Sequence, residues 1–184
     1  MKQKFLKKSI FIAVLIPYLL LGNTDSFLDA INHAPDVETR IKSRLEYVLA
    51  YSKTDFENTR FQAQKALAEA QQISSPQLTS QALFELSEVY YKHSQFDSSG
   101  IFLNKALVIA LEQADYNLEA QVLSKLGSIR LFKRDHTQAI TYYTSAIEAA
   151  EKVDNYRLLG TCYSSISNIF RLLGSYEKAL ESII

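Results

Sequence analysis

The chain has 184 residues, enough for one domain, and 47% of them are hydrophobic, with only five Gly and three Pro. This composition excludes a disordered chain, which would be less apolar, and an all-β fold, which would need more turn residues. The formal net charge is zero, but four of the 20 basic residues lie in the first eight positions, so the other 16 face 20 acidic residues. Such a body gives no reason to expect nucleic-acid binding, which needs a clustered basic surface.

The first 24 residues have the layout of a secretory signal peptide. Four lysines precede the apolar stretch 10–21, and no acidic residue occurs before Asp25. At about 1.5 Å per residue the apolar stretch is too short to cross a hydrocarbon core of roughly 30 Å. We expect residues 1–24 to direct export to the periplasm or cell envelope, with an uncleaved anchoring helix as the alternative. Residues 25–35 show no strong period and are interpreted as a tether.

The rest of the chain is predicted to form helical hairpins. Leu83, Leu86 and Val89 recur at the three- and four-residue spacing of a packed helix. Ser75 followed by Pro76 indicates a helix start, and Gly174 can take the positive φ that ends a helix. The hairpins are expected at 36–74, 76–113, 116–153 and 156–184, the last of them partial.

The first hairpin is a looser copy of the others. Its second helix keeps their register through Phe56, Ala63 and Ala66. Its first helix, with Ile41 and Leu45, fits only if the turn between the two helices is about one residue shorter. Because terminal repeats are often atypical, we interpret this hairpin as an N-terminal cap.

Like residues recur every 40 positions along these hairpins. Ala66, Ala106 and Ala146 are one such series. Self-similarity of this kind indicates stacked units that bury their apolar faces against their neighbours, which is a solenoid. A second series consists of Phe56, Phe96, His136 and Tyr176.

These residues resemble the tetratricopeptide repeat, in which a large residue, Leu-Gly and Tyr of one helix precede a small residue and an aromatic of the next. The resemblance implies an all-α, right-handed superhelical solenoid of antiparallel helical hairpins, with the last hairpin incomplete. The repeat of 40 residues departs from the family's 34 and is similar to repeats of bacterial sensory and regulatory proteins. The matching residues are Leu83, Leu86-Ser87 and Tyr90, then Leu123, Leu126-Gly127 and Arg130, then Tyr163, Ile166-Ser167 and Phe170, with Ala139, Tyr143 and Ala146 in a second helix.

In the family that these repeats resemble, ligands usually lie along the concave face formed by the first helices. The same face here is a mixed polar and aromatic wall, which suits hydrogen bonds to a peptide backbone and an apolar anchor; an ordinary solvated face is the alternative. Recognition of an acidic C-terminus is not expected, because Glu88 and serines stand where Lys and Asn would form a carboxylate clamp. The predicted ligand-binding residues are Gln81, Phe84, Glu88, Tyr91, Gln121, Ser124, Ser128, Ser164, Asn168 and Arg171.

No catalytic residue, cofactor or metal site is expected in this chain. His33, His93 and His136 are scattered, and one cysteine cannot form a thiolate zinc site. Phosphate-binding glycine loops and paired metal-ligand motifs are absent. A nucleophilic pair of Cys162 and His136 would need a third, orienting group and a cleft. We therefore interpret Cys162 as a buried or half-buried thiol.

The sequence thus predicts an exported module that binds a protein or peptide. The preferred context is the sensory N-terminal part of a longer signal-transduction protein, and the alternative is a free-standing cell-envelope scaffold for assembly or secretion. In a third reading, a catalytic domain would lie beyond residue 184. Membrane contact is expected only through an uncleaved leader or a missing C-terminal part. The partial last hairpin predicts either such a part or a partner that covers it.

Overall fold

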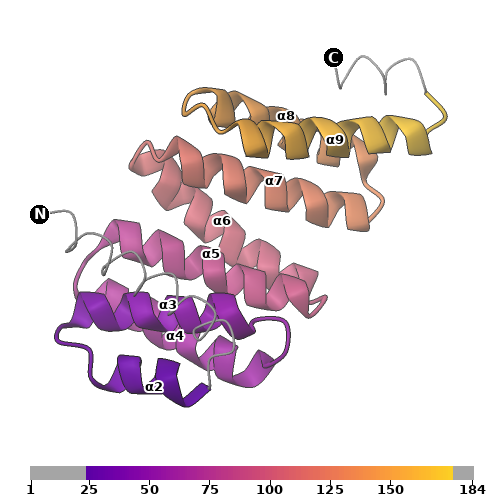
Figure 1. The fold of residues 1–184 in the computed structure, drawn as a ribbon. Helices are drawn as coiled ribbons and strands as arrows, with labels where there is room; N and C mark the ends of the chain where they lie inside the picture. The colour runs from indigo at the N-terminus through magenta and orange to yellow at the C-terminus, as the bar shows by residue number, and fades with distance from the viewer. Residues whose placement is uncertain (1–23, 176–184) are drawn as a thin grey trace, which may run out of the picture.

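The computed structural model describes residues 24–175, which form eight α-helices and no strand within that range (Figure 1). None of these helices has the length and hydropathy of a membrane span. The expected all-α class is confirmed. The predicted signal peptide, apart from Thr24, and the second helix of the fourth hairpin lie outside the described residues. The helices are α2 (Thr24–Asn32), α3 (Val37–Tyr51), α4 (Phe56–Gln72), α5 (Pro76–Lys92), α6 (Phe96–Glu112), α7 (Tyr116–Phe132), α8 (His136–Glu151) and α9 (Tyr156–Leu172).

The helices stack as antiparallel hairpins in a solenoid. Figure 1 shows α2 at one end of the stack and α9 at the other. Helices α3, α5 and α7 each pair with the helix that follows, and α5, α7 and α9 also pack on the second helix of the preceding hairpin. Because α4, α6 and α8 begin 40 residues apart, as do α5, α7 and α9, the period read from the sequence is the period of the structure.

The turns are built on one recurring device. In the turn after α6, Ala114 has φ 51°, and the Asp115 N–H reaches back to the Ala110 carbonyl at 2.9 Å, which closes the helix. Asp115 then begins α7, because its Oδ1 accepts a hydrogen bond from the Leu118 N–H at 3.0 Å. One residue therefore ends one helix and starts the next. The positive-φ residues, spaced 20 apart, are Ser74, Ser94, Ala114, Arg134, Asp154 and Gly174.

Residues 25–35, which the sequence analysis assigns to a tether, instead contain most of helix α2. The Phe27 ring meets Tyr47 and Tyr51 of α3 edge to face, with centroids 6.3 and 5.8 Å apart, and Ile31 is buried. The tether prediction is wrong because nine helical residues are too few to display a period. Helix α2, packed on α3, covers the outer side of the first hairpin.

The turn of the first hairpin also differs from its prediction. It has four residues, 52–55, against three in 93–95, so it is one residue longer and not shorter. The extra length brings the buried Ser52 against the end of α5. Lys92 Nζ donates to Ser52 Oγ at 2.6 Å, and His93 Nε2 lies 3.0 Å from the Ser52 carbonyl oxygen. These contacts tie the first hairpin to the second.

Small residues bring the helices close together, as the sequence pattern predicts. A Cβ atom added to Gly127 of α7 would lie 3.0 Å from Cδ1 and Cε1 of Tyr143 on α8. The Tyr143 ring is only 2% exposed, and its hydroxyl lies 3.0 Å from Ser128 Oγ. Cys162 is buried as expected, and burial raises the pKa of its thiol. Both sites belong to the core rather than to a reactive centre.

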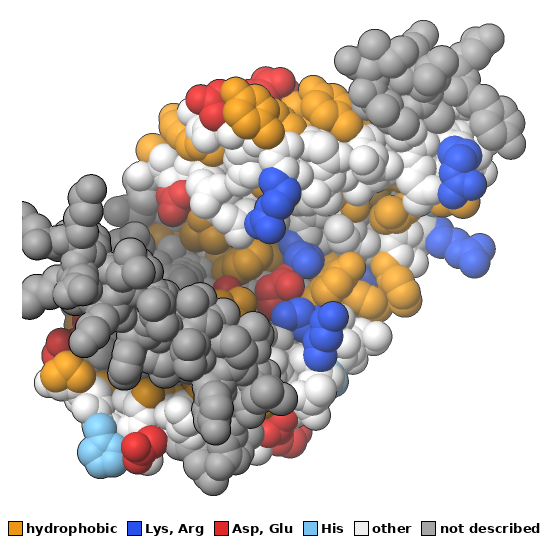
Figure 2. Space-filling model, in the orientation of Figure 1, with side chains coloured by type: hydrophobic (Ala, Val, Ile, Leu, Met, Phe, Trp, Pro, Cys, Tyr) orange, Lys and Arg blue, Asp and Glu red, His pale blue; other side chains and the backbone are white. Residues whose placement is uncertain are grey.

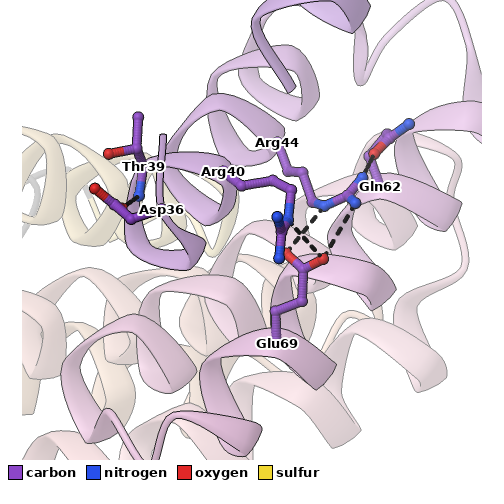
Figure 3. A network of polar contacts seen from close by, with 6 residues as sticks. All are labelled: Asp36, Thr39, Arg40, Arg44, Gln62 and Glu69. Carbon is purple, nitrogen blue, oxygen red and sulfur yellow. Dashed lines mark hydrogen bonds and ion pairs between the residues drawn. The ribbon is translucent and has the colours of Figure 1, made fainter. Parts of the chain in front are cut away.

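A polar network fastens α3 to α4 within the first hairpin (Figure 3). Glu69 of α4 accepts hydrogen bonds from Arg40 Nε at 3.1 Å and from Arg44 Nε and Nη2 at 3.2 Å. Arg44 Nη1 also donates to Gln62. Because the Arg44 and Glu69 side chains are only 13% and 17% exposed, this ion pair is shielded from water.

Candidate functional site

The predicted ligand-binding residues lie on the first helices α5, α7 and α9. On these helices the structure forms two cavities, one between α5 and α7 and the other between α7 and α9. Figure 2 shows that the molecule is hollowed near the middle of this view, where acidic and basic side chains meet beside hydrophobic ones. We call the surface that runs over α5, α7 and α9 the groove.

The first cavity has a volume of about 200 Å³. Helices α3 and α5 touch directly, as do α7 and α9, whereas the backbones of α5 and α7 lie farther apart. The cavity opens in this wider space. Three of the predicted residues, Gln81, Phe84 and Gln121, line it.

A charged and aromatic cluster continues the groove beyond this cavity. Lys125 Nζ of α7 lies 2.9 Å from Glu88 Oε1 of α5 and 4.5 Å from the centroid of the Tyr91 ring. The Tyr91 ring in turn meets Phe96 edge to face at 5.4 Å. The structure therefore brings the predicted residues Glu88 and Tyr91 together, joined by a lysine that the sequence analysis did not select.

The second cavity, of about 590 Å³, is lined by α9 and the end of α7. Ser164 and Asn168 line it, and Arg171 lies beside it, donating from Nη2 to Asn168 Oδ1 at 2.7 Å. Ser124 and Ser128 line neither cavity. Ser124 is buried, and Ser128 Oγ bonds to the Tyr143 hydroxyl and the Ser124 carbonyl. These two serines contribute to packing beneath the groove.

Glu85 is, besides Lys125, another groove residue that was not predicted from the sequence. Its side chain lines the first cavity and is only 7% exposed. Burial, followed by the negative charge of Glu88, raises the pKa of its carboxyl to about 7. The sequence did contain a hint: Glu85 lies three residues before Glu88 and 40 residues, one repeat, before Lys125, in a helix whose core positions are apolar.

Metal binding and histidine chemistry find no support in the part of the chain that the structure describes. No group of three or more His, Cys, Asp or Glu side chains in residues 24–175 is arranged to hold a metal ion. His93 is half-buried and its ring packs at a tilt against Phe56, with centroids 4.8 Å apart, so it is a packing residue. The chemistry that the groove offers is hydrogen bonding, charge pairing and aromatic contact.

The comparisons with known proteins agree with this architecture. Residues 118–182 match the family model described as tetratricopeptide repeat. No curated protein matches the sequence significantly. Among solved structures, BtubC (BKLC) from P. vanneervenii superposes with a TM-score of 0.76 at 19% identity, over 89% of this chain and 72% of that one.

Two further solved structures are those of a Rap protein and of a quorum sensor. A Rap protein complexed with competence and sporulation factor matches with a TM-score of 0.76 at 16% identity, over 98% of this chain and 49% of its own. The apo form of the quorum sensor NprR from B. thuringiensis matches with a TM-score of 0.60 at 18% identity, over 86% of this chain and 50% of its own. At these identities the likeness is one of fold, and this chain spans about half the length of both proteins.

Proposed function

We propose, from the premise that this chain belongs to the tetratricopeptide repeat family, that its groove binds an extended peptide or an extended segment of a protein. The observation that carries the proposal is the arrangement of two cavities along α5, α7 and α9, with the Glu88, Lys125 and Tyr91 cluster between them. A peptide backbone needs donors and acceptors along its length, and its side chains need separate recesses. The groove offers both.

The groove would bind its ligand without catalysing a reaction, and the ordered helices around it favour high affinity. Helices that are already packed lose little conformational freedom when the ligand arrives. In a stacked array each repeat contacts only its neighbours, so a ligand that spans α5, α7 and α9 stabilises the interfaces between them. Binding in the groove would therefore stiffen the array.

The preferred context is the sensory part of a signal-transduction protein that acts outside the cytoplasm. A Rap protein complexed with a competence and sporulation factor and the quorum sensor NprR share this fold, which supports a regulatory role. The layout of residues 1–24 supports export to the periplasm or envelope. A fusion of residues 1–35 to a reporter that is active only outside the cytoplasm tests this, and a silent reporter with unprocessed protein would refute export.

A second candidate is a free-standing envelope scaffold that docks a partner on α9. It is favoured by the apolar side chains that α9 and its following turn leave exposed, including Tyr156 at 74% and Leu172 at 60%. Tyr156→Ser and Leu172→Ser separate the two candidates. They would abolish docking of a partner on α9 and leave peptide binding in the groove unchanged.

Peptide selection against the purified full chain tests groove binding. Peptides are selected from a random phage-displayed library, synthesised, and titrated against Tyr91→Ala and Arg171→Ala groove variants. Ile101→Ala, on α6 and 57% exposed, is the control away from the groove. The groove variants should weaken binding while circular dichroism stays helical, and the control should not. Equal affinity of all variants would reject this surface.

A further inference from the structure

We infer that the cavity between α5 and α7 receives a basic side chain, arginine or lysine, of the bound peptide, and that Glu85 is the residue that holds it. The inference rests on the proposed function, because it names the ligand chemistry of one part of the groove. It goes further in predicting a charge preference at one position of the ligand.

Glu85 is a buried acid without a partner. Its side chain is 7% exposed, yet it forms no hydrogen bond or ion pair with any residue of the described range. The two cations that act on Glu85 electrostatically bind elsewhere, since Lys125 pairs with Glu88 at 2.9 Å and Lys92 donates to Ser52 at 2.6 Å. Burying an unpaired carboxylate opposes folding. A cation that enters the cavity would supply the missing partner.

The cavity wall is suited to a cation. None of its nine lining residues is Lys, Arg or His. Asp115 contributes a second carboxylate, of which Oδ1 already caps α7, and the half-buried Phe84 ring offers a face on which a guanidinium or ammonium group can rest. The volume of about 200 Å³ is several times the roughly 30 Å³ of one water, which fits the end of a long side chain. The lining residues are Gln77, Ser80, Gln81, Phe84, Glu85, Asp115, Asn117, Leu118 and Gln121.

The ionisation of Glu85 gives this site a measurable signature. The charged groups that face it are Glu88 and Lys92 on α5, Lys125 on α7 and, across the cavity, Asp115. Because burial raises the pKa of Glu85 to about 7, about half of the free protein carries the neutral acid at pH 7. A bound cation favours the carboxylate. Binding of a basic peptide should therefore strengthen between pH 6 and pH 8 and release a proton.

The test removes the charge of the peptide and the charge of Glu85, separately and together, and measures the effect on binding. A selected peptide with arginine is titrated beside the same peptide with citrulline, which keeps the shape and removes the charge. Both are measured on the full chain, on Glu85→Gln, and on Glu112→Gln, an exposed acid of α6, as the matched control. We expect Glu85→Gln to weaken the arginine peptide at least about tenfold and the citrulline peptide much less. The Glu112→Gln variant should match the original chain, and the pH dependence should vanish in Glu85→Gln.

The outcomes separate this inference from the proposed function. Selected peptides without a basic preference, or an arginine peptide that binds Glu85→Gln undiminished, would overturn the cation site. If Tyr91→Ala still abolished their binding, the groove proposal would stand. If no peptide were selected at all, both would fail. Glu85→Gln removes a buried charge while keeping the side-chain shape, so weaker peptide binding by this variant would not be explained by loss of folding.

Discussion

Replacing Gly127 by alanine tests whether the close contact between α7 and α8 limits the size of residues in the core. The new Cβ would meet the Tyr143 ring at 3.0 Å from both Cδ1 and Cε1. The ring cannot retreat easily, because it is 2% exposed and its hydroxyl bonds to Ser128. Overpacking of this kind costs about 1–3 kcal/mol. It outweighs the gain of about 1 kcal/mol that alanine brings to a helix interior, so the net loss is expected at roughly 0–2 kcal/mol.

Gly100 provides the matched control on α6. A Cβ at Gly100 would meet nothing within 4 Å, so Gly100→Ala should gain about 1 kcal/mol from helix propensity alone. The difference between the two variants isolates the contact and should be about 1–3 kcal/mol. It is measured by urea unfolding followed by circular dichroism, with the midpoint and slope compared for each variant.

A double variant then identifies the residue responsible. In the background Tyr143→Leu, which removes the ring that the new Cβ meets, Gly127→Ala should cost less than in the original chain. The reasoning would be refuted if Gly127→Ala stabilised the protein as much as Gly100→Ala, or if its cost were unchanged by Tyr143→Leu.

Three other predictions concern the turns, the first hairpin and the groove. Ala114 has φ 51° and is exposed, so Ala114→Gly should stabilise the protein by about 1 kcal/mol. Ala68→Gly, at an exposed position inside α4, should destabilise it by a similar amount. Thermal unfolding would contradict this if both variants shifted the melting temperature in the same direction. Glu69→Gln should cost about 1–3 kcal/mol because it weakens the shielded bonds to Arg40 and Arg44, whereas Glu38→Gln, in an ion pair that is 59% exposed on the Glu38 side, should change stability by less than about 0.5 kcal/mol. The raised pKa of Glu85, about 7 against a usual 4.5, means that its contribution to stability is present below pH 4.5 and is lost as pH rises through 7. Glu85→Gln should therefore stabilise the protein more at pH 8 than at pH 5, and an equal effect at both would show that the carboxyl titrates normally.

The repeat made most of the fold predictable. Helix starts at Phe56, Phe96 and His136 follow the 40-residue register because each hairpin packs on the next in the same way. Gly174 was predicted to take positive φ, and it does, at 73°. The positive φ in the other five turns was not predicted, because the residues that adopt it, such as Arg134 and Asp154, are not glycines. The packing of the stacked hairpins, and not the residue type, imposes this backbone conformation.

Local sequence was a weaker guide where tertiary contacts decide the outcome. Helix α2 is stabilised by the packing of Phe27 and Ile31 on the first hairpin. Such contacts cannot be predicted from a segment of nine residues. The register of the first helices was predictable, and three of the residues chosen by that register, Gln81, Phe84 and Gln121, line one cavity. The burial of Glu85 was not, because it depends on how the neighbouring helices pack around α5.

Hydrogen exchange of the full chain with and without a selected peptide tests the central claim most directly. Amides of the first helices α5, α7 and α9 should exchange more slowly in the complex, since the ligand bridges them, while α4 and α6 change less. Protection centred on α4 and α6 would place the ligand outside the groove, and protection of α9 alone would show that the ligand does not bridge the first helices. Either result would contradict the account.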